Sequence, residues 1–287
     1  MTAIDRRNFL KSLGIGGAGI ALAGSPLLIS ACSSVKKADS GTETELVALR
    51  VSSDLYKTDL KQRFAFSIFD QDSKVASEGK LDVEITSPTS KKQTFKDVEV
   101  REKGIPGQGI FSVMAVLDEV GNWEMKTKFK GKQLDLAFAV EQTNIAPALN
   151  KPCPTGPTPT EKNPLDATIL CTRFDGDCGL HKTDVPSLLN SKKPFVVIFA
   201  TPARCQTSYC GPVLDLTKEV AKNSDIKAIH IEIYKNETSN DVLDAVSEWG
   251  LQTEPWLFGI NADGTINSRL DGAFDMSEIE EVFAQLS

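Results

Sequence analysis

Short stretches of alternating apolar and polar residues fill the first half of the chain. They cover residues 46–51, 63–69, 81–86, 109–116, 123–129 and 134–140. Alternation with a period of two predicts strands that bury one face and expose the other. Turn-forming pairs such as Ser87-Pro88 and Gly121-Asn122 separate the stretches. Because no helical periodicity interrupts them, we expect residues 45–142 to form a sandwich of antiparallel sheets.

The second half mixes short apolar runs with helical patterns. The run Phe195–Phe199 lies between two prolines and predicts a strand that is buried on both faces. Further strands are predicted at 226–234, 256–260 and 265–270, and helices at 213–223, 240–249 and 276–286. This β-α-β-α-β-β-α order predicts an α/β domain over residues 167–287. The expected fold class is therefore multidomain, with an all-β domain followed by an α/β domain.

Residues 143–166 separate the two predicted domains. Five prolines lie between positions 147 and 159 in an otherwise polar segment. Such a density of proline favours extended, semi-rigid backbone. We expect a linker that packs little and is open to proteolysis.

The first residues resemble a targeting signal rather than part of a folded domain. Asp5-Arg6-Arg7-Asn8-Phe9-Leu10-Lys11 matches the twin-arginine export pattern, and a glycine-rich apolar segment follows. Leu28-Ile29-Ser30-Ala31-Cys32 resembles a bacterial lipobox. The resemblance implies a signal peptide over 1–31, a lipid on Cys32 and a polar tether over 32–44. The expected location is the bacterial cell envelope, on the outer side of a membrane; the alternative is a plain export signal with an incidental cysteine.

The net charge limits the kinds of molecule that the protein can bind, and the number of cysteines limits its disulfides. The chain has 287 residues and a net charge of −7, without a cluster of Lys and Arg. That balance argues against binding to nucleic acid, which needs a basic surface. Removing Cys32 from the six cysteines leaves five, which permit two disulfides and one free thiol in an exported protein. Cys153 could pair with Cys178, or Cys171 could pair with Cys205 or Cys210.

Cys205 and Cys210 follow the central strand and precede Gly211-Pro212, which suits the first turn of a helix. A thiolate is favoured there, because backbone N–H groups and the helix dipole stabilise negative charge. Five residues apart on one helix, the two cysteines would be separated by about 7.5 Å along the axis, too far for a disulfide. A bond between them therefore requires Cys205 in the loop and Cys210 at the helix entrance.

This stretch also carries a family resemblance. Tyr209-Cys210-Gly211-Pro212 resembles the thioredoxin active site W-C-G-P-C, with Val213 at the position of the second cysteine. Phe199-Ala200-Thr201-Pro202 before two cysteines resembles the Sco and TlpA-like branches of that superfamily, with four intervening residues in place of three. The resemblance implies a thioredoxin-like domain in which Pro255 is the cis-proline facing the cysteines. It also implies that Cys210 attacks, that Cys205 resolves and that His230 replaces a buried lysine.

The first half resembles, more loosely, small extracytoplasmic immunoglobulin-like sandwiches of the YtkA-like type, from Gly109 through Gly121-Asn122-Trp123. Nothing in that half has catalytic spacing.

The sequence thus favours a thiol–disulfide oxidoreductase that acts on extracytoplasmic protein thiols or disulfides without a cofactor. Its expected catalytic residues are Cys210, Cys205, Pro255 and His230, although His230 is alternatively a hydrogen-bonded core residue. One alternative is a copper-binding protein of the Sco type with Cys205, Cys210 and His181 as ligands. The other is a non-catalytic scaffold.

Overall fold

The computed structural model describes residues 45–72, 74–76, 78–205 and 209–286. The twin-arginine pattern, the lipobox and Cys32 lie outside these residues. Within the described part, no helix is long and apolar enough to cross a membrane.

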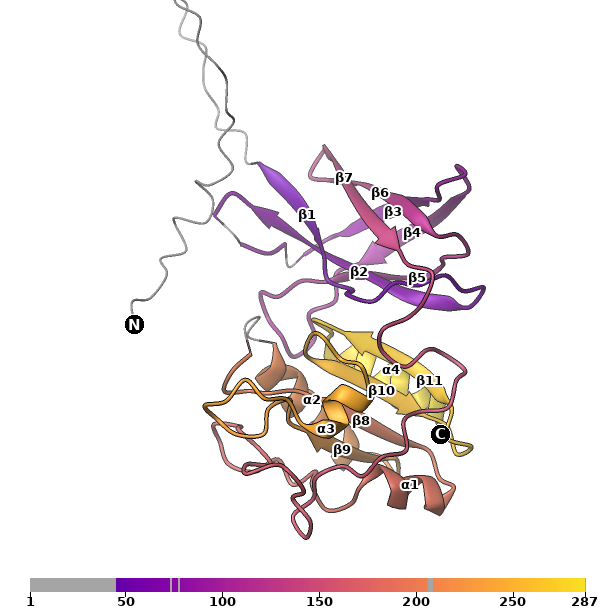
Figure 1. The fold of residues 1–287 in the computed structure, drawn as a ribbon. Helices are drawn as coiled ribbons and strands as arrows, with labels where there is room; N and C mark the ends of the chain where they lie inside the picture. The colour runs from indigo at the N-terminus through magenta and orange to yellow at the C-terminus, as the bar shows by residue number, and fades with distance from the viewer. Residues whose placement is uncertain (1–44, 73, 77, 206–208, 287) are drawn as a thin grey trace, which may run out of the picture. The chain divides into compact units, whose positions relative to one another are not determined.

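Seven antiparallel strands make up the first half of the described chain (Figure 1). One sheet has the order β1-β2-β5 and is built from β1 (Leu46–Arg50), β2 (Lys61–Asp70) and β5 (Phe111–Val116). The other has the order β4-β3-β6-β7 and is built from β4 (Lys92–Glu99), β3 (Lys80–Thr86), β6 (Gly121–Phe129) and β7 (Lys132–Val140). Aromatic side chains fill the core between the sheets: the rings of Phe64 and Phe138 lie 4.4 Å apart, centroid to centroid. The predicted sandwich of alternating strands is confirmed.

A third sheet, of order β11-β10-β8-β9, lies in the second half. Its strands are β8 (Phe195–Phe199), β9 (Lys227–Ile231), β10 (Trp256–Ile260) and β11 (Ile266–Asp271). Strands β8 and β9 are parallel, and β10 pairs antiparallel with both β8 and β11. The helices are α1 (Val185–Ser191), α2 (Cys210–Lys222), α3 (Asp244–Glu248) and α4 (Met276–Leu286).

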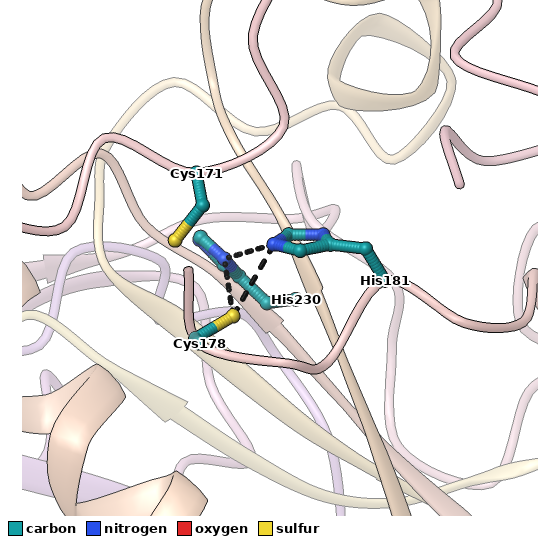
Figure 2. Close-up of side chains that lie close together, drawn as sticks. All are labelled: Cys171, Cys178, His181 and His230. Atoms are coloured by element: carbon teal, nitrogen blue, oxygen red, sulfur yellow. Dashed lines mark hydrogen bonds between the residues drawn. The ribbon is translucent and has the colours of Figure 1, made fainter. Parts of the chain in front are cut away.

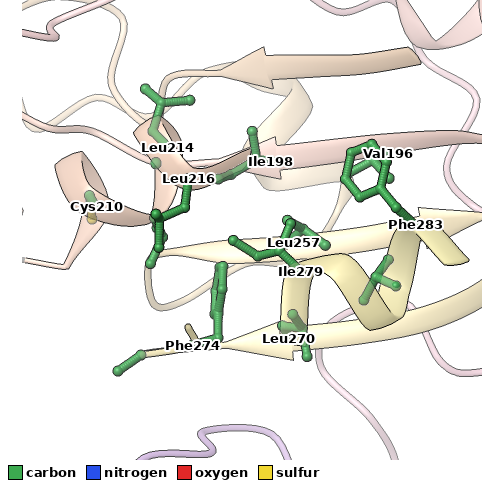
Figure 3. Close-up of a cluster of buried hydrophobic side chains, with 14 of the residues drawn as sticks. Val196, Ile198, Cys210, Leu214, Leu216, Leu257, Leu270, Phe274, Ile279 and Phe283 are labelled. Atoms are coloured by element: carbon green, nitrogen blue, oxygen red, sulfur yellow. The ribbon is translucent and has the colours of Figure 1, made fainter. Parts of the chain in front are cut away.

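Two hydrophobic clusters use the side chains of the third sheet. Alternate residues of β8 divide between them, with Ile198 in one cluster and Val197 in the other. The first cluster contains residues of α2 and α4 (Figure 3), and the second contains residues of α1 and α3. Because β8 is apolar at every position and buried throughout, it can supply both clusters.

The expected fold class was wrong. Three sheets dominate the described chain, which has a β-sandwich-type fold rather than an immunoglobulin-like domain followed by a separate thioredoxin-like α/β domain. Helical periodicity indicated where the helices lie, but it did not indicate how short some of them are: α1 has seven residues and α3 has five. The described residues also belong to one compact unit.

The proline-rich segment contributes to that compactness. The Asn150 N–H donates to the Ile266 carbonyl at 2.9 Å, and the Ile266 N–H donates to Lys151 at 2.8 Å. The Cys153 N–H donates to the Gly264 carbonyl at 2.9 Å, and the Cys153 side chain is buried. The expectation of a segment that packs little was therefore wrong, because proline leaves neighbouring N–H groups and all carbonyls free to pair with β11. The domain boundaries at 142 and 166 stay a prediction.

Candidate functional site

A disulfide joins Cys205 to Cys210 at the entrance of α2. Cys210 is the first residue of the helix, and the two Cα atoms lie 5.8 Å apart, within the range that a disulfide allows. The Cys210 N–H, one of the free donors of the first helical turn, points to the Cys205 sulfur at 3.2 Å. The structure thus places Cys205 before the helix and Cys210 at its start, as the spacing required.

The two cysteines differ in burial. Cys210 is fully buried and belongs to the cluster that contains Val213 and Leu214 of α2 (Figure 3). Cys205 is only partly buried. An incoming thiolate must reach the sulfur that it attacks. The exposures therefore argue against Cys210 as the attacking thiol and favour Cys205.

Glu254 and Pro255 adjoin the loop that follows β8. Their peptide bond is cis, as the resemblance implied for Pro255. The Glu254 carboxylate accepts a hydrogen bond from the Thr201 N–H at 2.7 Å. Burial raises the pKa of Glu254 to about 7, and the Thr201 N–H only partly offsets this effect.

Four further side chains converge at a second place (Figure 2): Cys171, Cys178, His181 and His230. One donor atom from each lies within 4.8 Å of all the others. The Cys178 sulfur is 3.2 Å from His181 Nε2 and 3.4 Å from His230 Nδ1, and these two nitrogens are 3.4 Å apart. All but Cys171 are buried.

Backbone pairing positions this cluster. His230 lies on β9, and its backbone N–H donates to the Leu180 carbonyl at 3.1 Å, which brings the segment carrying the other three residues against the strand. Beside Cys171, the Thr172 N–H donates to the Glu232 carboxylate at 2.6 Å. His230 Nε2 lies 2.8 Å from the carbonyl oxygen of Ala200. A carbonyl can only accept, so Nε2 carries a proton, and Nδ1 is the ring nitrogen that faces the cluster and offers a lone pair when the ring is neutral.

The two thiols of the cluster have opposite acidities. A hydrogen bond from Cys178 holds the pKa of Cys171 far below its ordinary value, and hydrogen bonds from the two imidazoles act in the same direction. The pKa of Cys178 is raised well above its ordinary value by the same pairing and by burial. The arrangement therefore holds one thiolate readily, at Cys171, and one thiol.

The structure groups the expected site residues differently from the sequence interpretation. The copper alternative combined His181 with Cys205 and Cys210, whereas the two cysteines are bonded to each other and His181 lies with the second cluster. The considered pairing of Cys153 with Cys178 does not occur either, since both are free thiols in the described structure. His230 belongs to the second cluster rather than only to the core. The spacing of Cys178 and His181 was an available signal, but it points to a ligand set only once His230 is known to lie beside it.

No known family matches the sequence, and no curated protein does. Among the solved structures that show a likeness to this chain, two are matched over one third of it. The Lin-41 filamin domain is 13% identical over 33% of this chain and 93% of its own, with a TM-score of 0.24. A conjugative transposon lipoprotein from Bacteroides eggerthii DSM 20697 is 8% identical over 33% of this chain and 95% of its own, with a TM-score of 0.18. At such scores neither likeness carries an argument about fold, location or function.

Proposed function

We propose that this chain is a thiol–disulfide oxidoreductase of the bacterial cell envelope that acts on extracytoplasmic protein thiols or disulfides. The observation that carries the proposal is the Cys205–Cys210 disulfide at the first residue of α2, in which Cys205 is a partly exposed residue and Cys210 a buried one.

The geometry supports a defined sequence of bond changes. A client thiolate attacks the Cys205 sulfur, the Cys205–Cys210 bond breaks, and the electron pair departs with the Cys210 sulfur. The N–H groups and dipole of α2 stabilise that leaving thiolate. A second client thiol, after losing its proton to solvent, attacks the client sulfur of the mixed disulfide and releases Cys205. The client leaves as a disulfide, and the chain keeps two electrons until a disulfide-carrying partner protein oxidises it again.

A mixed-disulfide trap tests this assignment. Reduced Cys210→Ser should accumulate adducts through Cys205 when it is mixed with a peptide disulfide, because the partner thiol of Cys205 is no longer there to resolve them. Reduced Cys205→Ser should accumulate few adducts through Cys210, since Cys210 is buried. Cys153→Ser is the matched control for losing a cysteine elsewhere. Equal trapping by both variants would contradict the roles, and trapping by neither would favour the scaffold.

Attachment to the membrane by a lipid on Cys32 belongs to the same proposal and rests on the lipobox-like residues alone. Cys32→Ser should move the protein from the membrane fraction to the soluble fraction. Intact mass measurement of the wild-type chain should show a lipidated Cys32 as the first residue; an unmodified N-terminus at another position would remove the anchor from the proposal.

A further inference from the structure

The distances within the second cluster match those of a filled metal site. Zinc binds imidazole nitrogen at about 2.0–2.1 Å and thiolate sulfur at about 2.3 Å in a tetrahedron. In a tetrahedron with those bond lengths, two nitrogens lie about 3.4 Å apart and a nitrogen and a sulfur about 3.6 Å apart. The observed separations are 3.4 Å between His181 Nε2 and His230 Nδ1, and 3.2 and 3.4 Å from these nitrogens to the Cys178 sulfur. The nitrogen–nitrogen separation equals that of a bound ion, and the two nitrogen–sulfur separations are shorter by about 0.2 and 0.4 Å, so a small outward shift of the Cys178 sulfur would give the geometry of a bound ion.

The donors can also take the tautomer and charge that a divalent ion needs, with Cys178 losing its proton when the ion binds. Because His230 Nε2–H donates to the Ala200 carbonyl, Nδ1 faces the cluster as a ligand atom. Metal-binding histidines usually make such a bond with their other nitrogen, which fixes the ring. Cys171 and Cys178 as thiolates would neutralise the two positive charges of the ion, so the buried site would carry no net charge.

Three of the four residues lie in a long irregular segment, which a bound ion would cross-link to the rest of the protein. From Glu141 to Asp184 the described residues form no helix or strand apart from isolated bridges. Irregular segments of that length are uncommon in compact proteins. Cys171, Cys178 and His181 lie in this segment, whereas His230 lies on β9. An ion held by all four would tie the segment to the third sheet.

We propose that Cys171, Cys178, His181 and His230 bind one zinc ion in a closed, structural site. Four protein ligands leave no position for substrate, which distinguishes structural from catalytic zinc sites. Two nitrogens and two sulfurs in a tetrahedral arrangement suit zinc, whereas copper(I) prefers sites richer in sulfur. The site shares no ligand with the Cys205–Cys210 disulfide, so the inference stands independently of the proposed function.

Metal analysis of the purified chain tests the site. Protein dialysed against metal-free buffer should retain about one zinc per chain. The double variant Cys205→Ser/Cys210→Ser and the control Cys153→Ser should retain the same amount. His181→Gln should lose it, with zinc affinity lowered by more than the roughly 10- to 100-fold that follows from losing a ligand's hydrogen-bond partner.

Two measurements remain decisive if His181→Gln folds poorly. His181→Cys replaces one ligand with another and should recover zinc binding, which a merely structural role of the histidine would not predict. Cobalt(II) added to metal-free wild-type protein should give the visible absorption of a tetrahedral site with thiolate ligands. A Cys171–Cys178 disulfide in freshly purified protein, or copper(I) displacing zinc in a competition at equal concentrations, would overturn the assignment.

Discussion

The strongest predicted effect on stability concerns an ion pair between the sandwich and the last helix. Arg63 of β2 donates to both carboxylate oxygens of Glu278 in α4, at 2.7 and 2.9 Å. It also donates to the carbonyls of Asp271 at 3.1 Å and Ala273 at 2.7 Å. Both side chains of the pair are 4% exposed. Burial alone would raise the pKa of Glu278, but the charge and hydrogen bonds of Arg63 keep it below its ordinary value.

Arg63→Met should therefore be severe, because it leaves a buried carboxylate with one remaining side-chain donor, Ser112 at 2.8 Å. Breaking a buried pair in this way costs about 3–5 kcal/mol. With an m-value of about 3 kcal/mol per molar urea, a loss of about 4 kcal/mol lowers the unfolding midpoint by more than 1 M. Urea denaturation followed by circular dichroism measures this shift.

Three comparisons separate the charge effect from lost packing. Arg63→Met/Glu278→Met should regain most of the stability, because an apolar pair of similar volume often replaces a buried ion pair at little cost. Lys103→Met breaks an exposed pair with Glu280 on the same helix and should cost less than about 1 kcal/mol. Glu278 without Arg63 should protonate readily, so the cost of Arg63→Met should shrink as the pH falls toward 5. A cost under 1 kcal/mol, or one independent of pH, would refute the reasoning.

Three further predictions follow from the site and the proline-rich segment. Glu254→Gln should gain stability relative to wild type between pH 5 and 8, seen as a growing difference in melting temperature. Burial raises the pKa of Glu254 in the folded protein from 4.5 to about 7, so the wild-type protein loses stability as the pH rises through that range. A constant difference would contradict this. Cys153, whose pKa burial raises to about 11, should resist alkylation in the native protein at pH 8 while Cys171 reacts in metal-free protein, as read by peptide mass mapping; equal labelling would count against it. Limited proteolysis should spare residues 143–163, because backbone hydrogen bonds tie Asn150 and Lys151 to Ile266 of β11 and Cys153 to Gly264. Early cleavage there would show that these contacts open easily.

The strands could be predicted where burial alternates cleanly. Strand β3 has every second side chain buried, and the sequence marks it at nearly the same residues, 81–86. Strand β4 (Lys92–Glu99) escaped notice because none of its residues is fully buried. Only Phe95 and Val98 are apolar, so the alternation is weak. Hydrophobic periodicity arises from the burial of one face, and an exposed edge strand has little buried surface.

The disulfide could be predicted from the sequence and the second cluster could not, because only the disulfide joins residues that are close in the sequence. Cys205 and Cys210 are near neighbours, so the dimensions of a helix show that a bond between them requires one of them to precede the helix. The second cluster joins His181 to His230, 49 residues away, through pairing of β9 with an irregular segment. No local pattern encodes that approach. Exposure is likewise a tertiary property, which is why the motif suggested Cys210 as the attacking thiol although the fold buries it.

The proposed zinc site and the disulfide share a supporting framework without sharing ligands. The Ala200 carbonyl accepts from His230 of the cluster, while Ala200 also begins the loop that leads to Cys205. In the same loop, the Ala203 N–H donates to the hydroxyl of Thr172, the residue after Cys171, at 3.1 Å. Losing the ion should free these contacts and loosen the loop, whereas opening the disulfide leaves every ligand in place. The dependence should therefore run in one direction: thiol exchange relies on an intact metal site, and metal binding does not rely on the disulfide.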